Sequence, residues 1–309
     1  MEIKNILVAN RLYKEIKEIV EKNPMEQNFR YMPEEEVSLE DLNWADAYVG
    51  FRPTSNFQFG QLKWVHSLAA GVDRFVSLNW KKDVLLTRTI DMFGKKIGEY
   101  CLSYMLKDNQ LHNEFSELQS NKTWQVLAPK SLQSQSVVIF GTGEIGSYLA
   151  KIFSFFNMKV IGVSMSGSPK ENFERVVTLT EAHEYLKTAD WMISTLPFTN
   201  DTDKLLNKNI FKYLQNAGFI NVGRGATVDE DSLLEALKLG NIRKAILDVF
   251  TFEPLPSSSE FWKRPNVIIT PHISALTSPE EGVNCFLQTL SKLSQNQPLT
   301  NVVNIEKGY

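Results

Sequence analysis

One stretch decides the fold of this 309-residue chain: Val137-Val138-Ile139-Phe140-Gly141-Thr142-Gly143-Glu144-Ile145-Gly146. A short apolar run, typical of a buried strand, ends at the first of three glycines, and a helix is predicted from Ser147 to Phe156. The first glycine permits a tight turn, the second lets the backbone approach a diphosphate, and the third lets the helix lie close to the strand. The helix N-terminus offers free N–H groups to an anion. We therefore predict that residues 141–146 bind a dinucleotide.

Two other interpretations of this glycine-rich loop have to be weighed. A P-loop is excluded, because no Lys-Ser or Lys-Thr pair follows Gly146. A glycine-rich turn in some other α/β protein remains open as an alternative. The strand before the loop and the helix after it favour dinucleotide binding.

Strand-like and helix-like segments alternate on both sides of the loop, as in proteins built on parallel sheets. Six apolar runs predict one doubly wound sheet: residues 137–140, 159–164, 191–195, 218–222, 245–249 and 267–270. Nearer the N-terminus, three more runs predict strands of a second sheet, at residues 6–9, 47–51 and 64–68, with a helix at 12–21.

The chain is therefore predicted to form two doubly wound parallel-sheet domains, one Rossmann-type and one flavodoxin-like, with a cleft between them. We place the dinucleotide-binding domain at residues 97–283 and the other domain at 1–96, completed by 284–309. The segment after Cys285 is too short for a domain and is expected to pack back onto the N-terminal part. A single long helix is predicted from Ile97 to Gln119.

Composition excludes several classes of protein. Hydrophobic residues make up 43% and charged residues 22%, and a net charge of -3 gives no basic surface for nucleic acid. No apolar run approaches the roughly 20 residues that span a bilayer, and the N-terminus lacks a signal-peptide pattern. Cys101 and Cys285 fit no metal or redox motif. We expect a cytoplasmic protein without a metal, a membrane contact or a nucleic-acid partner.

Three polar residues, Arg224, Glu253 and His272, follow three successive predicted strands, whose carboxyl ends share one edge of the sheet. A guanidinium can bind the carboxylate and carbonyl of a keto acid with its forked donors. Imidazole titrates in the range that proton transfer needs, and a carboxylate bonded to it would favour the imidazolium. Each residue alone has an ordinary explanation as an ion-pair, loop or turn residue. Together, after a dinucleotide loop, they predict an acid–base site.

The chain resembles the D-isomer-specific 2-hydroxyacid dehydrogenase family over nearly its whole length, and in particular its short, glyoxylate/hydroxypyruvate reductase-like members. The resemblance rests on five motifs: Gly141 to Gly146, Leu196 to Thr202, Asn221 to Ala226, Asp248 to Leu255 and Pro271 to Ala275. It implies hydride transfer between NAD(P)H and a small 2-keto acid or D-2-hydroxy acid. It also implies a homodimer, with the Ile97–Gln119 helix at the interface.

The family resemblance further implies the roles of individual residues. Arg224 would bind the substrate, Glu253 would partner His272, and His272 would be the general acid/base. Residues 1–96 and 284–309 would form the substrate domain, where the backbone N–H groups of Ala70 and Gly71 would hold the substrate carboxylate. Asp248 would contact the nicotinamide carboxamide. The cofactor cleft would be lined by Leu196, Pro197, Thr202, Val222, Gly223 and His272.

The choice of cofactor is expected to depend on Ser164-Met165-Ser166, which ends the strand after the glycine loop and should contact the cofactor. An NAD enzyme usually has an acidic residue there for the ribose 2′-hydroxyl. Two hydroxyls without a carboxylate would accept a 2′-phosphate, although no arginine is present and Lys170 is the nearest cation. NADP-preferring relatives commonly carry an arginine in place of Met165. On balance we expect NADP to be favoured over NAD.

Two other functions remain open on the same scaffold, because a fold does not fix a function. The chain could be a cofactor-sensing binding protein or corepressor with little turnover. It could also belong to related enzymes that oxidise formate or phosphite. Turnover of a panel of 2-keto acids distinguishes these alternatives.

Overall fold

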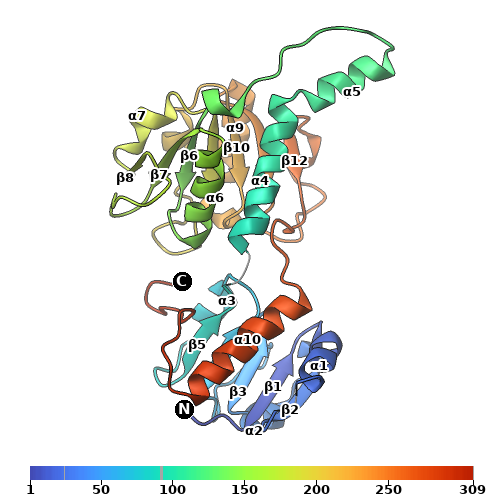
Figure 1. Cartoon of the computed structure of the whole chain (residues 1–309), viewed down its shortest axis with the longest axis vertical. Coiled ribbons are helices and arrows are strands. Elements are labelled where there is room, and N and C mark those ends of the chain that lie inside the picture. The colour runs from blue at the N-terminus through green and yellow to red at the C-terminus, as the bar shows by residue number, and fades with distance from the viewer. Residues whose placement is uncertain (24, 91–92, 309) are drawn as a thin grey trace. The chain divides into compact units, whose positions relative to one another are not determined.

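The computed structural model describes residues 1–23, 25–90 and 93–308 and forms two compact units (Figure 1). Unit 1 comprises Met1–Asp91 with Leu276–Tyr309, and unit 2 comprises Met92–Ala275. Each unit is built on one main sheet, and every strand pairing described within these two sheets is parallel. The predicted fold class of two parallel-sheet α/β domains is thereby confirmed.

Unit 1 has a five-stranded sheet in the order β2-β1-β3-β4-β5, which is the flavodoxin-like order. Its strands are β1 (Asn5–Ala9), β2 (Asn28–Met32), β3 (Ala47–Gly50), β4 (Trp64–Ser67) and β5 (Leu85–Arg88). Its helices are α1 (Tyr13–Glu21), η1 (Glu34–Glu36), α2 (Leu39–Trp44), α3 (Asp73–Val76) and α10 (Pro279–Ser294). The sequence does not predict β2, because its residues are only partly buried and lack clear apolar alternation.

The C-terminal segment packs onto unit 1. The ring of Phe286 stacks on that of Trp64, with centroids 5.4 Å apart, and Asn301 Nδ2 donates to the carbonyl of Arg88 at 2.9 Å. Beside these rings lies His66, whose Nδ1 contacts Thr87 Oγ1 at 2.8 Å. Complete burial lowers the pKa of His66 to about 3. This histidine is therefore a neutral residue of the core.

Unit 2 has a seven-stranded sheet in the order β12-β11-β10-β9-β6-β7-β8, so the strand order reverses between β6 and β9. Its strands are β6 (Ser136–Phe140), β7 (Lys159–Val163), β8 (Arg175–Val177), β9 (Trp191–Ser194), β10 (Ala217–Asn221), β11 (Ile242–Leu247) and β12 (Val267–Ile269). The six predicted strands are present. The seventh, β8, has three residues and is too short to produce a pattern in the sequence.

Helices cover both faces of this sheet (Figure 1). The helices of unit 2 are α4 (Phe93–Asn109), α5 (His112–Ser120), α6 (Glu144–Phe155), α7 (Ala182–Leu186), α8 (Lys208–Phe211) and α9 (Glu230–Leu239), with short 3-10 turns η2 (Leu132–Ser134), η3 (Gly225–Thr227) and η4 (Glu260–Lys263). The central strands β9 and β10 are buried along their whole length, as a sheet covered on both faces requires. Among the described residues, no helix is both long and apolar enough to cross a bilayer.

The boundaries between the units differ from those predicted at 96/97 and 283/284. Both predicted boundaries would cut a helix, since α4 starts at Phe93 and α10 starts at Pro279. Helix α10 begins before the predicted boundary at 283/284, because Ser278 and Glu281 form a capping box and a proline occupies the first turn. Assigning substrate to one unit and dinucleotide to the other remains a prediction.

The prediction of one helix from Ile97 to Gln119 is wrong. Helix α4 ends at Asn109, and α5 begins at His112 after Leu111 adopts a left-handed φ of 56°. The side chains at the end of α4 are bonded to the sheet, whereas α5 has no buried residue. The chain therefore leaves the body of unit 2 at this point, and α5 with the segment after it stands out from it (Figure 1).

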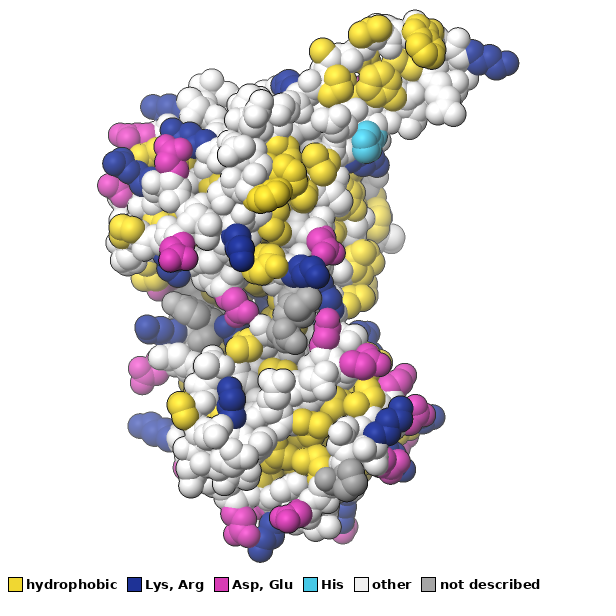
Figure 2. All heavy atoms as spheres, viewed as in Figure 1, with side chains coloured by type: hydrophobic (Ala, Val, Ile, Leu, Met, Phe, Trp, Pro, Cys, Tyr) yellow, Lys and Arg dark blue, Asp and Glu magenta, His cyan; other side chains and the backbone are white. Residues whose placement is uncertain are grey.

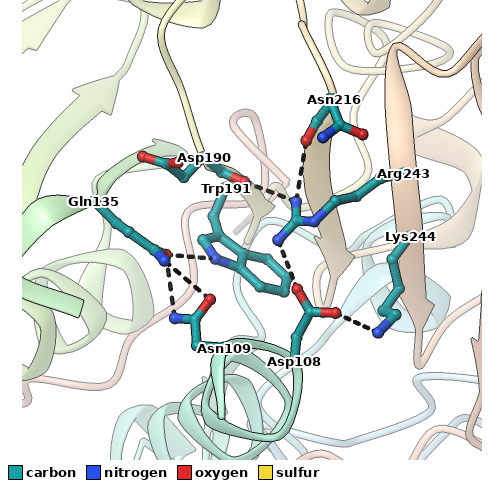
Figure 3. A network of polar contacts seen from close by, with 8 residues as sticks. All are labelled: Asp108, Asn109, Gln135, Asp190, Trp191, Asn216, Arg243 and Lys244. Atoms are coloured by element: carbon teal, nitrogen blue, oxygen red, sulfur yellow. Dashed lines mark hydrogen bonds and ion pairs between the residues drawn. The ribbon is translucent and has the colours of Figure 1, made fainter. Parts of the chain in front are cut away.

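A polar network fixes the end of α4 to the sheet (Figure 3). Asp108 accepts from Arg243 Nη2 at 2.7 Å and also binds Lys244. The Arg243 guanidinium lies 4.7 Å from the ring centre of Trp191, and Trp191 Nε1 donates to Gln135 at 3.0 Å. Burial raises the pKa of Asp108, but the hydrogen bond from Lys244 and the two positive charges outweigh it, so the pKa is lowered.

We predict that Asp108→Asn destabilises the protein at neutral pH by about 1–2 kcal/mol, since a partly screened, charge-assisted interaction is lost. A lowered folded-state pKa means that the carboxylate stabilises the fold above its ordinary value of 3.8 and that this contribution disappears as pH falls through the folded value. Thermal unfolding of both proteins across this range measures the effect. The difference should shrink towards acid pH, and an undiminished difference there would assign the loss to packing. The exposed Asp83→Asn variant is the control.

Candidate functional site

The glycine loop has the form that a dinucleotide requires. Gly141 directly follows β6 and has a φ of +95°, and helix α6 begins at Glu144 with Gly143 as its N-cap. A Cβ on Gly146 would lie 1.9 Å from the carbonyl oxygen of Gly141, so the first turn of α6 lies directly against the loop. The corresponding position on Gly143 faces open space, with no atom within 4 Å. The loop therefore fits a diphosphate that approaches its backbone at the helix N-terminus.

Side-chain hydrogen bonds to the backbone hold the middle of the glycine loop in place. Thr142 is buried, and its carbonyl accepts from Lys170 Nζ at 2.6 Å and from Ser147 Oγ at 3.2 Å. Glu144 and Ile145 occupy the first turn of α6, exposed and half-buried. The contact of Lys170 with the loop is one that the sequence does not predict.

The end of β7 forms a turn stabilised by its own serine hydroxyls. Ser164 Oγ accepts from the backbone N–H of Gly167 at 3.2 Å, and Ser166 Oγ accepts from that of Ser168 at 3.3 Å. Met165 lies between the two serines with 83% of its surface exposed. The residues expected to contact the cofactor here are thus accessible.

The loops after β9 and β10 lie at the same edge of the sheet as the glycine loop, at the carboxyl ends of the strands. Thr202 Oγ1 donates to the carbonyl of Pro197 at 2.7 Å and fixes the loop that also carries the half-buried Leu196. After β10, Val222 is buried and the N–H of Gly223 donates to Asn221 at 3.2 Å. These are the positions predicted to line the cofactor cleft.

The structure brings together the three predicted catalytic residues. His272 Nδ1 and Glu253 Oε2 are 2.8 Å apart, and Glu253 Oε1 accepts from the N–H of Phe250 at 3.0 Å. Burial raises the pKa of Glu253, but these two hydrogen bonds and the charges of His272 and Arg224 outweigh it and lower the pKa. Arg224 follows β10, and its Nη1 donates to the carbonyl of Gly223 at 2.8 Å. The site thus combines a charged carboxylate, an imidazole and a guanidinium.

The loop that carries His272 is organised by Asp248. This carboxylate is fully buried and accepts from the backbone N–H groups of Ile273 and Ser274, both at 2.8 Å. The backbone carbonyl of Asp248 accepts from the N–H of His272 at 2.9 Å, and His272 has a left-handed φ of 55°. Asp248, predicted only as a cofactor contact, therefore also sets the backbone of the histidine.

Two further residues, Thr270 and Tyr100, complete this arrangement. Thr270 Oγ1 donates to Asp248 Oδ1 at 2.6 Å, and the hydroxyl of Tyr100 lies 2.7 Å from Thr270 Oγ1. Because the Thr270 hydrogen points to the carboxylate, Tyr100 must be the donor in the second bond. Burial raises the pKa of Tyr100, so the hydroxyl keeps its proton. The sequence does not indicate Tyr100, which lies 170 positions from its partner.

The predicted carboxylate-binding loop lies in unit 1. Ala70 and Gly71 follow β4 and are both half-buried. Arg88 Nη1 donates to the carbonyl of Ala70 at 3.0 Å, and the N–H of Ala69 donates to Ser67 Oγ at 3.3 Å. The loop is therefore fixed from within its own unit. Across the part of the chain that the structure describes, no three His, Cys, Asp or Glu side chains gather into a metal-binding group.

The sequence is similar to a known family and to named relatives. A profile of the D-isomer specific 2-hydroxyacid dehydrogenase NAD binding domain matches residues 102–274. A glyoxylate/hydroxypyruvate reductase A of Salmonella newport (strain SL254) is 30% identical in an alignment of 296 residues that covers 93% of this chain and 95% of that protein.

Solved structures extend the similarity to the whole fold. An NADPH-dependent glyoxylate/hydroxypyruvate reductase from Sinorhizobium meliloti, in complex with NADP and sulfate, has a TM-score of 0.87 at 27% identity and covers 99% of this chain and 100% of that one. A D-isomer specific 2-hydroxyacid dehydrogenase from Xanthobacter autotrophicus Py2, in complex with NADPH and MES, has a TM-score of 0.86 at 25% identity and covers 100% of both chains. The chain therefore belongs to the D-isomer specific 2-hydroxyacid dehydrogenase family.

Proposed function

We propose that this protein reduces a small 2-keto acid, such as glyoxylate or hydroxypyruvate, to the D-2-hydroxy acid with NADPH. The observation that carries the proposal is the 2.8 Å contact between His272 and Glu253, with Arg224 close enough to help lower the pKa of that carboxylate. The substrate class is supported by the names of the Salmonella and Sinorhizobium relatives.

Each of the three residues has a distinct role in this proposal. The Arg224 guanidinium binds the substrate carboxylate and polarises its carbonyl with forked donors. His272 gives a proton to the oxygen that becomes the hydroxyl, and Glu253, charged at neutral pH, orients the imidazole and offsets its positive charge. The bound nicotinamide cofactor supplies the hydride. In the reverse direction His272 accepts the proton.

The cofactor is assigned to unit 2 on the form of its glycine loop. Further cofactor contacts are assigned to residues 164–166 and to the loops after β9 and β10, with Asp248 at the nicotinamide carboxamide. NADP is preferred over NAD in this proposal, because no carboxylate follows β7 and because both solved relatives described above bind NADP(H). In unit 1, the backbone N–H groups of Ala70 and Gly71 are assigned to a substrate carboxylate.

A homodimer is part of the proposal, with residues 110–129, here termed the arm, as a contact between copies. The two ends of the arm lie next to each other, because the N–H of Lys130 donates to the carbonyl of Asn109 at 2.9 Å. It contains Trp124, which is 99% exposed, with the exposed Phe115 and Val126. Figure 2 shows hydrophobic side chains on the surface of this projection. A tryptophan exposed to this extent favours burial against another protein surface.

His272→Asn should lower kcat for glyoxylate or hydroxypyruvate by about 100-fold to 10,000-fold, the usual contribution of a positioned general acid. NADPH oxidation measures turnover, and quenching of protein fluorescence measures NADPH binding, which should persist. The half-buried His183→Asn variant, on α7 of the same unit, is the matched control. Wild-type protein that binds NADPH but reduces no keto acid would instead favour a cofactor-sensing protein.

Thr270→Val should reduce kcat more than it changes KM, because Asp248 loses one of its donors and the histidine loop is held less firmly. It should also destabilise the protein by about 1.5–3 kcal/mol, the usual contribution of a hydrogen bond to a charged group. Steady-state kinetics and thermal unfolding measure the two effects, and Thr270→Ser, which retains the hydroxyl, should restore both. Lower stability with unchanged kcat would leave Thr270 a purely structural role.

Trp124→Ser should convert a dimer into a monomer, because the arm would lose its largest apolar side chain. Light scattering after size-exclusion chromatography measures the mass. Leu239→Ser, which changes an exposed residue at the end of α9, should leave the dimer intact. A wild-type protein that is monomeric at micromolar concentration would contradict the proposal.

A further inference from the structure

We propose that Arg88 is a positioning residue for the substrate: it holds and polarises the peptide group between Ala70 and Gly71, so that the N–H of Gly71 binds the substrate carboxylate more strongly. This inference rests on the proposed function, because it takes the loop of Ala70 and Gly71 as the place where the keto acid binds. It gives a second arginine, in addition to Arg224, a part in substrate binding.

The loop after β4 contains two backbone N–H groups that are available to a ligand. Among the residues that the structure describes, the N–H groups of Ala70 and Gly71 donate to no acceptor, whereas that of Ala69 donates to Ser67 Oγ at 3.3 Å. Both residues are half-buried and are not enclosed in the core of unit 1. Successive backbone N–H groups in a turn form a concave site that attracts an anion.

Side chains hold the carbonyl groups of this loop one after another. Three successive carbonyls each accept one side-chain hydrogen bond: Leu68 from Thr277 Oγ1 at 3.0 Å, Ala69 from Ser67 Oγ at 3.2 Å, and Ala70 from Arg88 Nη1 at 3.0 Å. In a planar trans peptide the C=O and the N–H point in opposite directions. The N–H groups of Ala70 and Gly71 are therefore aimed by the side chains that hold the carbonyls of the same peptide groups.

Of these three donors, only Arg88 carries a charge, and a guanidinium keeps that charge throughout the range in which proteins are stable. Hydrogen bonds that follow one another in a chain polarise one another. A positive charge at the carbonyl oxygen of Ala70 therefore makes the N–H of Gly71 a stronger donor. A carboxylate bound to that N–H interacts with Arg88 through one peptide group, without touching the guanidinium.

The backbone of Arg88 is held from both sides, which fixes the origin of its side chain. Arg88 is the last residue of β5 and lies beside Ser67, the last residue of β4, in the parallel register of the two strands. On its other side, the N–H of Arg88 donates to the carbonyl of Asn301 at 3.0 Å, and its carbonyl accepts from Asn301 Nδ2 at 2.9 Å. The half-buried side chain of Arg88 thus starts from a rigid point next to the loop.

The test measures the KM of glyoxylate and, by calorimetry, the Kd of oxamate for the NADPH complex. Oxamate is an unreactive analogue that carries the same carboxylate. Arg88→Met removes both the donor and the charge, so KM and Kd should both rise about 5-fold to 30-fold, part of the loss expected for one hydrogen bond to a charged group. At saturating glyoxylate, kcat should change less than about threefold, because the lost interaction concerns binding. Arg88→Lys, which keeps the charge, should recover most of the affinity.

Arg74→Met is the matched control, because Arg74 is exposed, lies on α3 three residues after Gly71, and removes the same charge from the same unit. It should change KM and Kd by less than about twofold, as expected of an exposed charge. Arg88→Gln, which also lacks the charge, should weaken binding as Arg88→Met does and replaces that variant if it does not fold.

Three results would overturn the inference: unchanged KM and Kd in the neutral Arg88 variants, a fall in kcat without a rise in either constant, or an equal loss of affinity in Arg74→Met. The last would indicate a general effect of charge on unit 1. A wild type that binds oxamate but reduces no keto acid would contradict the proposed function, while the Kd of oxamate would still measure the contribution of Arg88.

Discussion

The buried carboxylate of Asp248 is the constraint on which the arrangement of the candidate site depends. It receives hydrogen bonds from the backbone of Ile273 and Ser274 and from the hydroxyl of Thr270, so the chain after β12 must turn at this point. A buried charge is tolerated only where its oxygens find donors, and here those donors belong to the loop of His272. The need to satisfy one carboxylate therefore fixes the imidazole within reach of Glu253.

The same edge of the sheet explains why the site can be assembled from distant parts of the sequence. Parallel strands bring all their carboxyl ends to one side, and the loops that follow β6, β7, β9, β10, β11 and β12 all begin there. Close backbone contact then joins neighbouring loops: a Cβ on Gly225 would lie 1.9 Å from the carbonyl carbon of Phe250. Cofactor contacts and acid–base chemistry can thus lie side by side on one rigid framework.

Features that follow from local chemistry could be read from the sequence, and those that depend on partners far along the chain could not. The glycine loop and the order Arg224, Glu253, His272 are local motifs, and the structure places them as their positions after strands predict. The break between α4 and α5 was not predictable, because the segment has good helix propensity on both sides. It is imposed where Asp108 and Asn109 bond to Arg243 and Gln135. Short strands such as β8 likewise lack enough residues for a pattern.

The sequence by itself determined the family and the two parallel sheets and supplied the three candidate acid–base residues, since each depends on residue type and spacing along a strand or turn. Only the tertiary structure decided which side chains support them. Tyr100 reaches Thr270 across 170 positions, and Lys170 reaches Thr142 across 28. The physical reason is that a hydrogen bond depends on distance in space and direction, and neither is encoded in the separation of two residues along the chain.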